Sequence, residues 1–101
     1  MSSVSDHVFY IRAKEMEKQH FESAIEEATN YRKTVYLNVT TQILCTKAFK
    51  KFKNKIETMF PDKIYSNKVH LILEASEKLF FYDLNEKIRK ILETKQDLFP
   101  K

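Results

Sequence analysis

Lysine side chains are concentrated in the middle third of this 101-residue sequence, where they form its densest cluster of charges of one sign. Residues 31–60 have a net charge of +6, whereas residues 1–30 have a net charge of −3 and residues 61–101 of +1. A patch of one sign can meet an acidic protein, a nucleic acid or an anionic lipid surface. The cluster consists of Lys47, Lys50, Lys51, Lys53 and Lys55.

A tyrosine and an arginine near the amino end form a second candidate for recognition. Tyr10 and Arg12 lie at the start of a predicted helix, where they are either a pair that faces a partner or a half-buried tyrosine beside a surface arginine. Opposed charges across an interface raise the association rate and the specificity. The residues that we expect to bind a partner are Tyr10, Arg12, Lys47, Lys50, Lys51 and Lys53.

The other reactive side chains give little support for metal binding or catalysis. The three histidines share no chelating spacing, and no HExxH pattern occurs. The single Cys45 excludes an internal disulfide and a cysteine-based zinc site, and no nucleophile signature surrounds it. Glycine is absent, which argues against a loop that cradles phosphate. We expect a non-enzyme that holds no metal or cofactor of its own.

The elements that position these side chains are predicted to be helices in one domain, residues 1–101. Average glycine usage is about 7%, so its absence favours helices joined by short connections over hairpins. The first helix begins near Ser5 or Asp6 and ends near Thr29. The second covers about 35–59 and stops before Pro61.

The third predicted helix runs from Ser66 or Asn67 to about residue 95. Residues 34–44 also alternate as a half-buried strand does, but the sequence offers no convincing second strand to pair with them. The prediction is therefore an all-α, three-helix bundle-like domain, with a bent or split first or second helix as a variant. Around residues 79–82 the third helix is apolar on nearly every side, so part of it is expected to meet another molecule.

Three stretches of the chain carry a resemblance to a known family. Phe9-Tyr10-Ile11-Arg12 looks like a Leu-Tyr-Arg signature with phenylalanine for leucine and one inserted isoleucine. Residues 47–54 resemble a basic-aromatic second-helix stretch that ends in asparagine, and residues 73–79 a third-helix pattern of leucine, small residue, glutamate and leucine. Together they resemble the LYR-motif family of small, basic, mitochondrial three-helix proteins. Asn30-Tyr31-Arg32 is an alternative anchor, which makes residues 5–28 an extra amino-terminal helix.

The resemblance implies a non-catalytic adaptor or accessory subunit of a mitochondrial, respiratory-type assembly. Several family members bind the mitochondrial acyl carrier protein, whose acyl–phosphopantetheine chain enters the helical core while basic side chains contact its acidic surface. By this resemblance the partner is an acidic acyl carrier protein, and it delivers the only cofactor. The residues expected to line the acyl chain are Leu79, Phe80 and Tyr82.

Two other classes of function stay open. Residues 73–86 resemble the long central helix of a core histone, and the lysines suit DNA phosphates, so a nucleic-acid-binding protein is the first alternative. A helical scaffold subunit without a ligand is the second. No apolar run approaches the roughly 20 residues of a membrane-spanning helix. Glu15 and Glu17 interrupt what would be a basic presequence, so the mitochondrial location depends on the resemblance alone.

Overall fold

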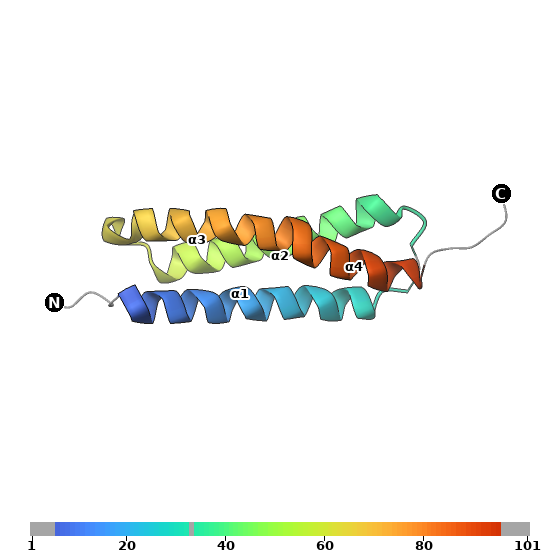
Figure 1. Ribbon diagram of the computed structural model, residues 1–101, viewed down its shortest axis with the longest axis horizontal. Coiled ribbons are helices and arrows are strands. Elements are labelled where there is room, and N and C mark those ends of the chain that lie inside the picture. Colours follow the sequence, from blue (N-terminus) through green and yellow to red (C-terminus); the bar gives the residue numbers. More distant parts are fainter. Residues whose placement is uncertain (1–5, 33, 96–101) are drawn as a thin grey trace.

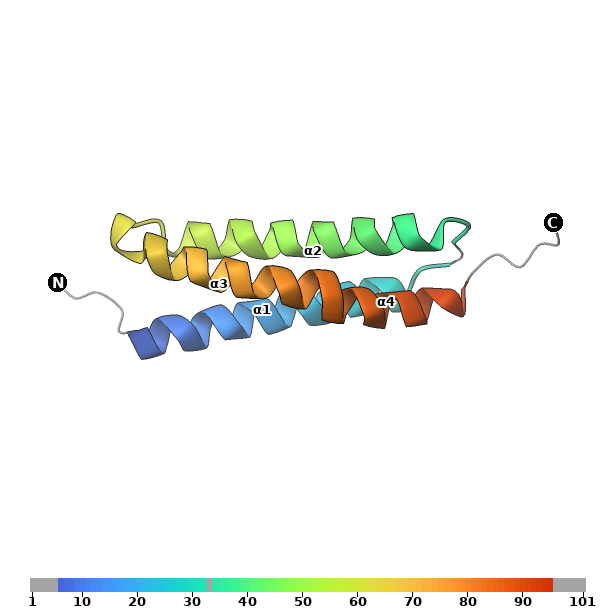
Figure 2. The ribbon, with the colours of Figure 1, turned by 45° about the horizontal axis from the view of Figure 1, so that its top comes forward.

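The computed structural model describes residues 6–32 and 34–95, and over them the chain forms an all-α bundle (Figure 1). Three helical rods run side by side along the long axis of the molecule, and each runs in the opposite direction to the one before it (Figures 1 and 2). The predicted all-α, three-helix bundle-like fold is confirmed. The elements are α1 (Asp6–Thr29), α2 (Leu37–Met59), the short 3-10 helix η1 (Lys63–Tyr65), α3 (Ser66–Lys78), the π-helical turn η2 (Leu79–Asp83) and α4 (Leu84–Glu93).

The connection between α1 and α2 explains why the second helix starts two residues later than predicted. The Thr34 amide donates a hydrogen bond to the Lys95 carbonyl at 3.0 Å, which holds the connection against the end of the third rod. The Thr34 and Thr40 hydroxyls lie 2.9 Å apart. The strand alternative for residues 34–44 is wrong, because Leu37 already begins α2 and the bridge at Thr34 is isolated.

The core follows the helical spacing of the apolar residues. One face of each rod is apolar at spacings of three and four, and these faces meet along the bundle axis. The largest fully buried side chains include Phe52, Phe80, Ile56, Leu84, Ile88 and Leu92. At the end where α2 turns into α3, Phe9 packs against two other rings, with centroids 4.5 Å from Phe60 and 5.9 Å from Tyr65, and these two rings also contact each other. These aromatic contacts close that end of the core.

The third rod changes its hydrogen-bonding pattern in the middle. α3, the π-helical turn η2 and α4 form one continuous rod (Figure 2), while α1 and α2 are unbroken helices. A π-helical turn takes up an extra residue within the helix. Ser76 before it and Leu84 after it are both buried, so both halves of the rod keep their core face toward α1 and α2. Among the described residues, no helix combines the length and apolar character that crossing a bilayer requires.

Candidate partner-binding surface

The lysines of α2 do not all have the same surroundings. The Lys47 ammonium lies 3.0 Å from a carboxylate oxygen of Glu27 on α1, so that charge is already paired. Lys50, Lys51 and Lys53 are exposed, and within the described ranges none of them has an ion-pair partner. The positive potential of α2 is therefore available from Lys50 onward.

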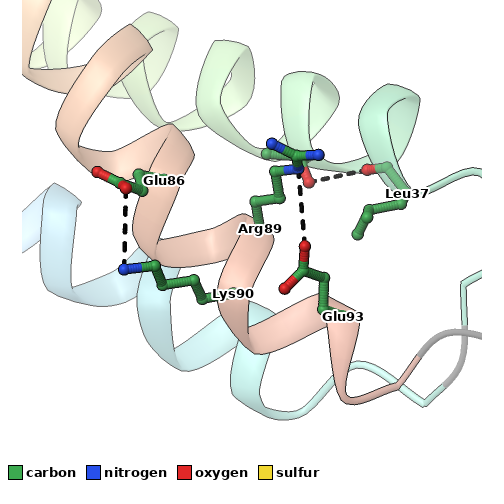
Figure 3. A network of polar contacts seen from close by, with 6 residues as sticks. Leu37, Glu86, Arg89, Lys90 and Glu93 are labelled. Atoms are coloured by element: carbon green, nitrogen blue, oxygen red, sulfur yellow. Dashed lines mark hydrogen bonds and ion pairs between the residues drawn. The ribbon is translucent and has the colours of Figure 1, made fainter.

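The arrangement of these lysines costs the helix some stability. Lys51 stands four residues after Lys47 and four before Lys55, and like charges at this spacing destabilise a helix by about 0.2–0.5 kcal/mol per pair. On α4 the opposite pattern holds (Figure 3): Lys90 lies 3.8 Å from Glu86 and Arg89 lies 4.0 Å from Glu93, and the members of each pair are four positions apart. Arg89 and Lys90 on α4 thus have carboxylate partners on their own helix, whereas Lys50, Lys51 and Lys53 on α2 have none among the described residues.

Lys53 faces a groove between α2 and α3. The groove has a volume of about 620 Å³, and its apolar floor includes Phe49, Val69 and Leu73. α3 buries only two of its side chains, Val69 and Ser76, which leaves this side of the bundle open. The rim is charged on both sides, with Lys53 and Lys63 against carboxylates of both α2 and α3.

Tyr10 and Arg12 are not brought together. Both are exposed on α1, and since two helical positions differ by about 200°, their side chains leave opposite flanks. The Lys14 ammonium lies 6.0 Å from the centre of the Tyr10 ring. The alternative pair, Tyr31 and Arg32, lies in the connection after α1, where both residues are exposed.

The three residues expected to line an acyl chain occupy different environments. Phe80 is 0% exposed, stacks on Phe52 at 5.8 Å between ring centres and also contacts Phe49 at 5.8 Å. Leu79 is partly buried, and Tyr82 is 72% exposed. The aromatic side chains of the bundle itself thus fill the space around Phe80, and Tyr82 is the strongly exposed part of the apolar stretch.

The remaining reactive side chains are embedded in the fold. Cys45 is fully buried, and desolvation raises the pKa of its thiol to about 11, against a smaller opposite effect of a hydrogen bond from Asn85. This suppresses the nucleophilic thiolate. The His20 ring nitrogen Nδ1 lies 2.8 Å from the Met16 carbonyl oxygen. In the described part of the chain, no three histidine, cysteine or acidic residues are arranged to hold a metal ion.

Sequence reasoning missed a buried polar link between α1 and α3. Glu17 is only 5% exposed; the Ser76 hydroxyl donates a hydrogen bond to its carboxylate, and the Lys14 ammonium lies 2.7 Å from its other oxygen. The hydrogen bond that the Lys14 ammonium donates to Glu17 is the main reason why the pKa of Lys14 is raised above 10.5. Ser76 lies at helical spacing from the apolar residues Val69 and Phe80, and a serine on such a face signals that a polar group must reach it.

An exposed apolar strip at the start of α2 was also missed. Val39 and Ile43 project from α2 with 57% and 58% of their surface exposed, and Tyr36, directly before the helix, is 71% exposed. The alternation of apolar residues in 34–44 could have revealed this exposed strip. When such a segment forms a helix, alternating residues fall on more than one face, and not all of these faces can meet the core. A comparison with protein-family models, curated proteins and solved structures finds no match to this chain.

Proposed function

We propose that this chain is a non-catalytic adaptor or accessory subunit that binds an acidic protein through the exposed lysines of α2. The observation that carries the proposal is the run of uncompensated charge at Lys50, Lys51 and Lys53. An array of like charges that lowers helix stability is best accounted for by a partner that neutralises it. The apolar groove beside Lys53 and the exposed Tyr82 add contact surface.

These lysines act mainly on the rate at which the partner associates. Exposed ion pairs contribute only about 0–1 kcal/mol each, so the lysines alone do not give a stable complex. Complementary charge instead raises association rates from about 10⁵–10⁶ to as much as 10⁸–10⁹ M⁻¹s⁻¹ at low salt. The proposal therefore requires a partner that adds apolar contacts to the acidic ones.

The likeness to the LYR-motif family makes an acyl carrier protein the first partner to test, within a mitochondrial respiratory-type assembly. In this version the carrier's acidic surface meets Lys50, Lys51 and Lys53. The acyl chain then enters the groove over Phe49 rather than the site of Phe80, because the latter is already filled by aromatic rings.

Affinity purification from the native source with paired baits tests the proposal. We expect the wild-type chain to retain an acidic protein that the Lys50→Glu/Lys51→Glu variant loses. The matched control is Lys78→Glu/Lys87→Glu, which changes the net charge equally at two exposed lysines of the third rod and retains the partner. Circular dichroism confirms that all baits are folded.

Three outcomes would contradict parts of this proposal. Equal recovery of the same proteins by the wild-type chain and the Lys50→Glu/Lys51→Glu variant removes the lysines from the interface. Recovery of nucleic acid with a steep salt dependence replaces the acidic protein with phosphates. An eluate whose intact masses include no acyl–phosphopantetheine protein removes the carrier version and leaves the adaptor function.

A further inference from the structure

The outward side of α2 carries a continuous line of residues that could contact another helix. Val39, Ile43, Thr46, Lys50 and Lys53 recur at alternating spacings of four and three, which is the spacing of a seam between packed helices. Lys50 lies about 200° around the helix from both Ala48 and Phe52, which are buried in the core. The line therefore faces away from the bundle core, and its last residue, Lys53, lies at the edge of the groove between α2 and α3.

This line changes character along its length. Its first half is apolar and begins beside Tyr36, whereas its second half is basic. A hollow of about 440 Å³ marks the junction, and its lining includes Ile43, Lys47 and Lys50. From Val39 to Lys53 the line is roughly 21 Å long, at about 1.5 Å per residue, which matches about four helical turns of a partner.

The separation of the two halves along the axis distinguishes among partners. A helix that lies on a membrane surface keeps an apolar face along its whole length, with basic residues at the sides. A phosphate backbone has no use for the apolar half, which would stay exposed to water. A protein helix with apolar side chains at one end of its contact face and carboxylates at the other satisfies both halves.

We infer that this outward line of α2, from Tyr36 to Lys53, is a docking site for one amphipathic helix of a partner protein. The partner helix sets apolar side chains over Val39 and Ile43 and carboxylates beside Lys50 and Lys51; Lys51 flanks the line and lines the same hollow as Ile43 and Lys50. The charged half rests on the proposed function, whereas the apolar half and the helical form of the partner go beyond it. Recognition by two segregated halves gives the site a register as well as an affinity.

The test uses synthetic helical peptides of about 18 residues and fluorescence anisotropy at physiological salt. The matched probe carries leucines on one half of its contact face and glutamates on the other half. The control peptide has the same composition and the same amphipathic face, but its leucines and glutamates alternate along the length. A peptide with the two halves exchanged is no control, because it binds in the opposite direction.

Two variants of the full chain separate the halves of the site. Val39→Gln/Ile43→Gln removes the apolar half with residues that favour a helix, and Lys50→Glu/Lys51→Glu reverses the basic half. We expect the matched peptide to bind the wild-type chain at least tenfold more tightly than the control peptide, and each variant to lose tenfold or more.

The outcomes distinguish a failure of this inference from a failure of the proposed function. Loss in the lysine variant without loss in the glutamine variant overturns the helix-docking site and leaves the proposed function standing. Loss only in the glutamine variant overturns both, since the charge then has no role. Equal binding of the two peptides, no binding of either, or glutamine-sensitive binding to phosphatidylserine vesicles also overturns the inference.

Discussion

Replacing Ser76 by alanine is expected to destabilise the bundle strongly, although it removes only one hydroxyl group. The substitution removes the hydrogen bond that the Ser76 hydroxyl donates to Glu17. The Glu17 carboxylate, which is 5% exposed, then keeps only its ion pair with Lys14 among the described residues. A hydrogen bond to a charged group contributes about 1.5–3 kcal/mol. For a domain of about 100 residues, roughly 2 kcal/mol corresponds to a fall in Tm of about 8–16 °C.

The companion variants identify the cause of that loss. Glu17→Leu/Ser76→Ala replaces both partners by apolar groups, and we expect it to be more stable than Ser76→Ala alone, because no buried carboxylate is left under-bonded. Ala75→Ser, one residue away at an exposed position, is the surface control and is expected to change stability by less than about 0.5 kcal/mol. Urea unfolding followed by circular dichroism measures all three. A Ser76→Ala loss below about 0.5 kcal/mol would refute the reasoning, since it would mean that water replaces the hydroxyl.

Three further predictions follow from the core and the surface. Phe80→Ala should lower the free energy of unfolding by about 3–5 kcal/mol, measured by urea titration, because Phe80 is fully buried against Phe49 and Phe52. A small loss of stability would mean that the site is a ligand cavity. A thiol reagent at pH 8 should label Cys45 at least roughly 100-fold more slowly in the folded chain than in urea, because burial raises its pKa from 9.0 to about 11. The stability that the protonated thiol contributes is present below pH 9.0 and is lost as the pH rises toward 11. Fast labelling of the folded chain would contradict the burial of Cys45. Arg12→Glu should weaken partner retention less than Lys50→Glu/Lys51→Glu does, because Arg12 lies on another helix; the reverse order would return the interface to the Tyr10–Arg12 pair.

The helical fold was predictable because its signals are local and repeated. The stripe through Phe9, Ala13 and Met16 and the stripe through Ala48 and Phe52 both bury where helical spacing places them. Proline at position 61 ended the second helix as expected. The start of α2 was less predictable, because Thr34 is held by the Lys95 carbonyl, a contact between residues far apart in the sequence.

The surface was harder to predict than the fold. Spacing alone placed Phe80 in an apolar stretch, but only the packing of α1 and α2 decides which side of that stretch is covered; Phe80 is buried and Tyr82 is exposed. Lysine density did not reveal that Lys47 is paired with Glu27, twenty residues earlier in the sequence. Charge patterns in a sequence identify the sign of a surface, whereas the available charges depend on neighbouring helices.

The salt dependence of binding by the retained partner tests the central role of the α2 lysines most directly. At about 0.15 M salt the screening length is about 8 Å, and at 0.01 M it is about 30 Å, so the association rate should rise steeply as salt is lowered. We predict this rise for the wild-type chain and its loss in Lys50→Glu/Lys51→Glu, with the Lys78→Glu/Lys87→Glu control closer to wild type. An association rate that is independent of salt, or a rise that persists in the α2 variant, would contradict the account.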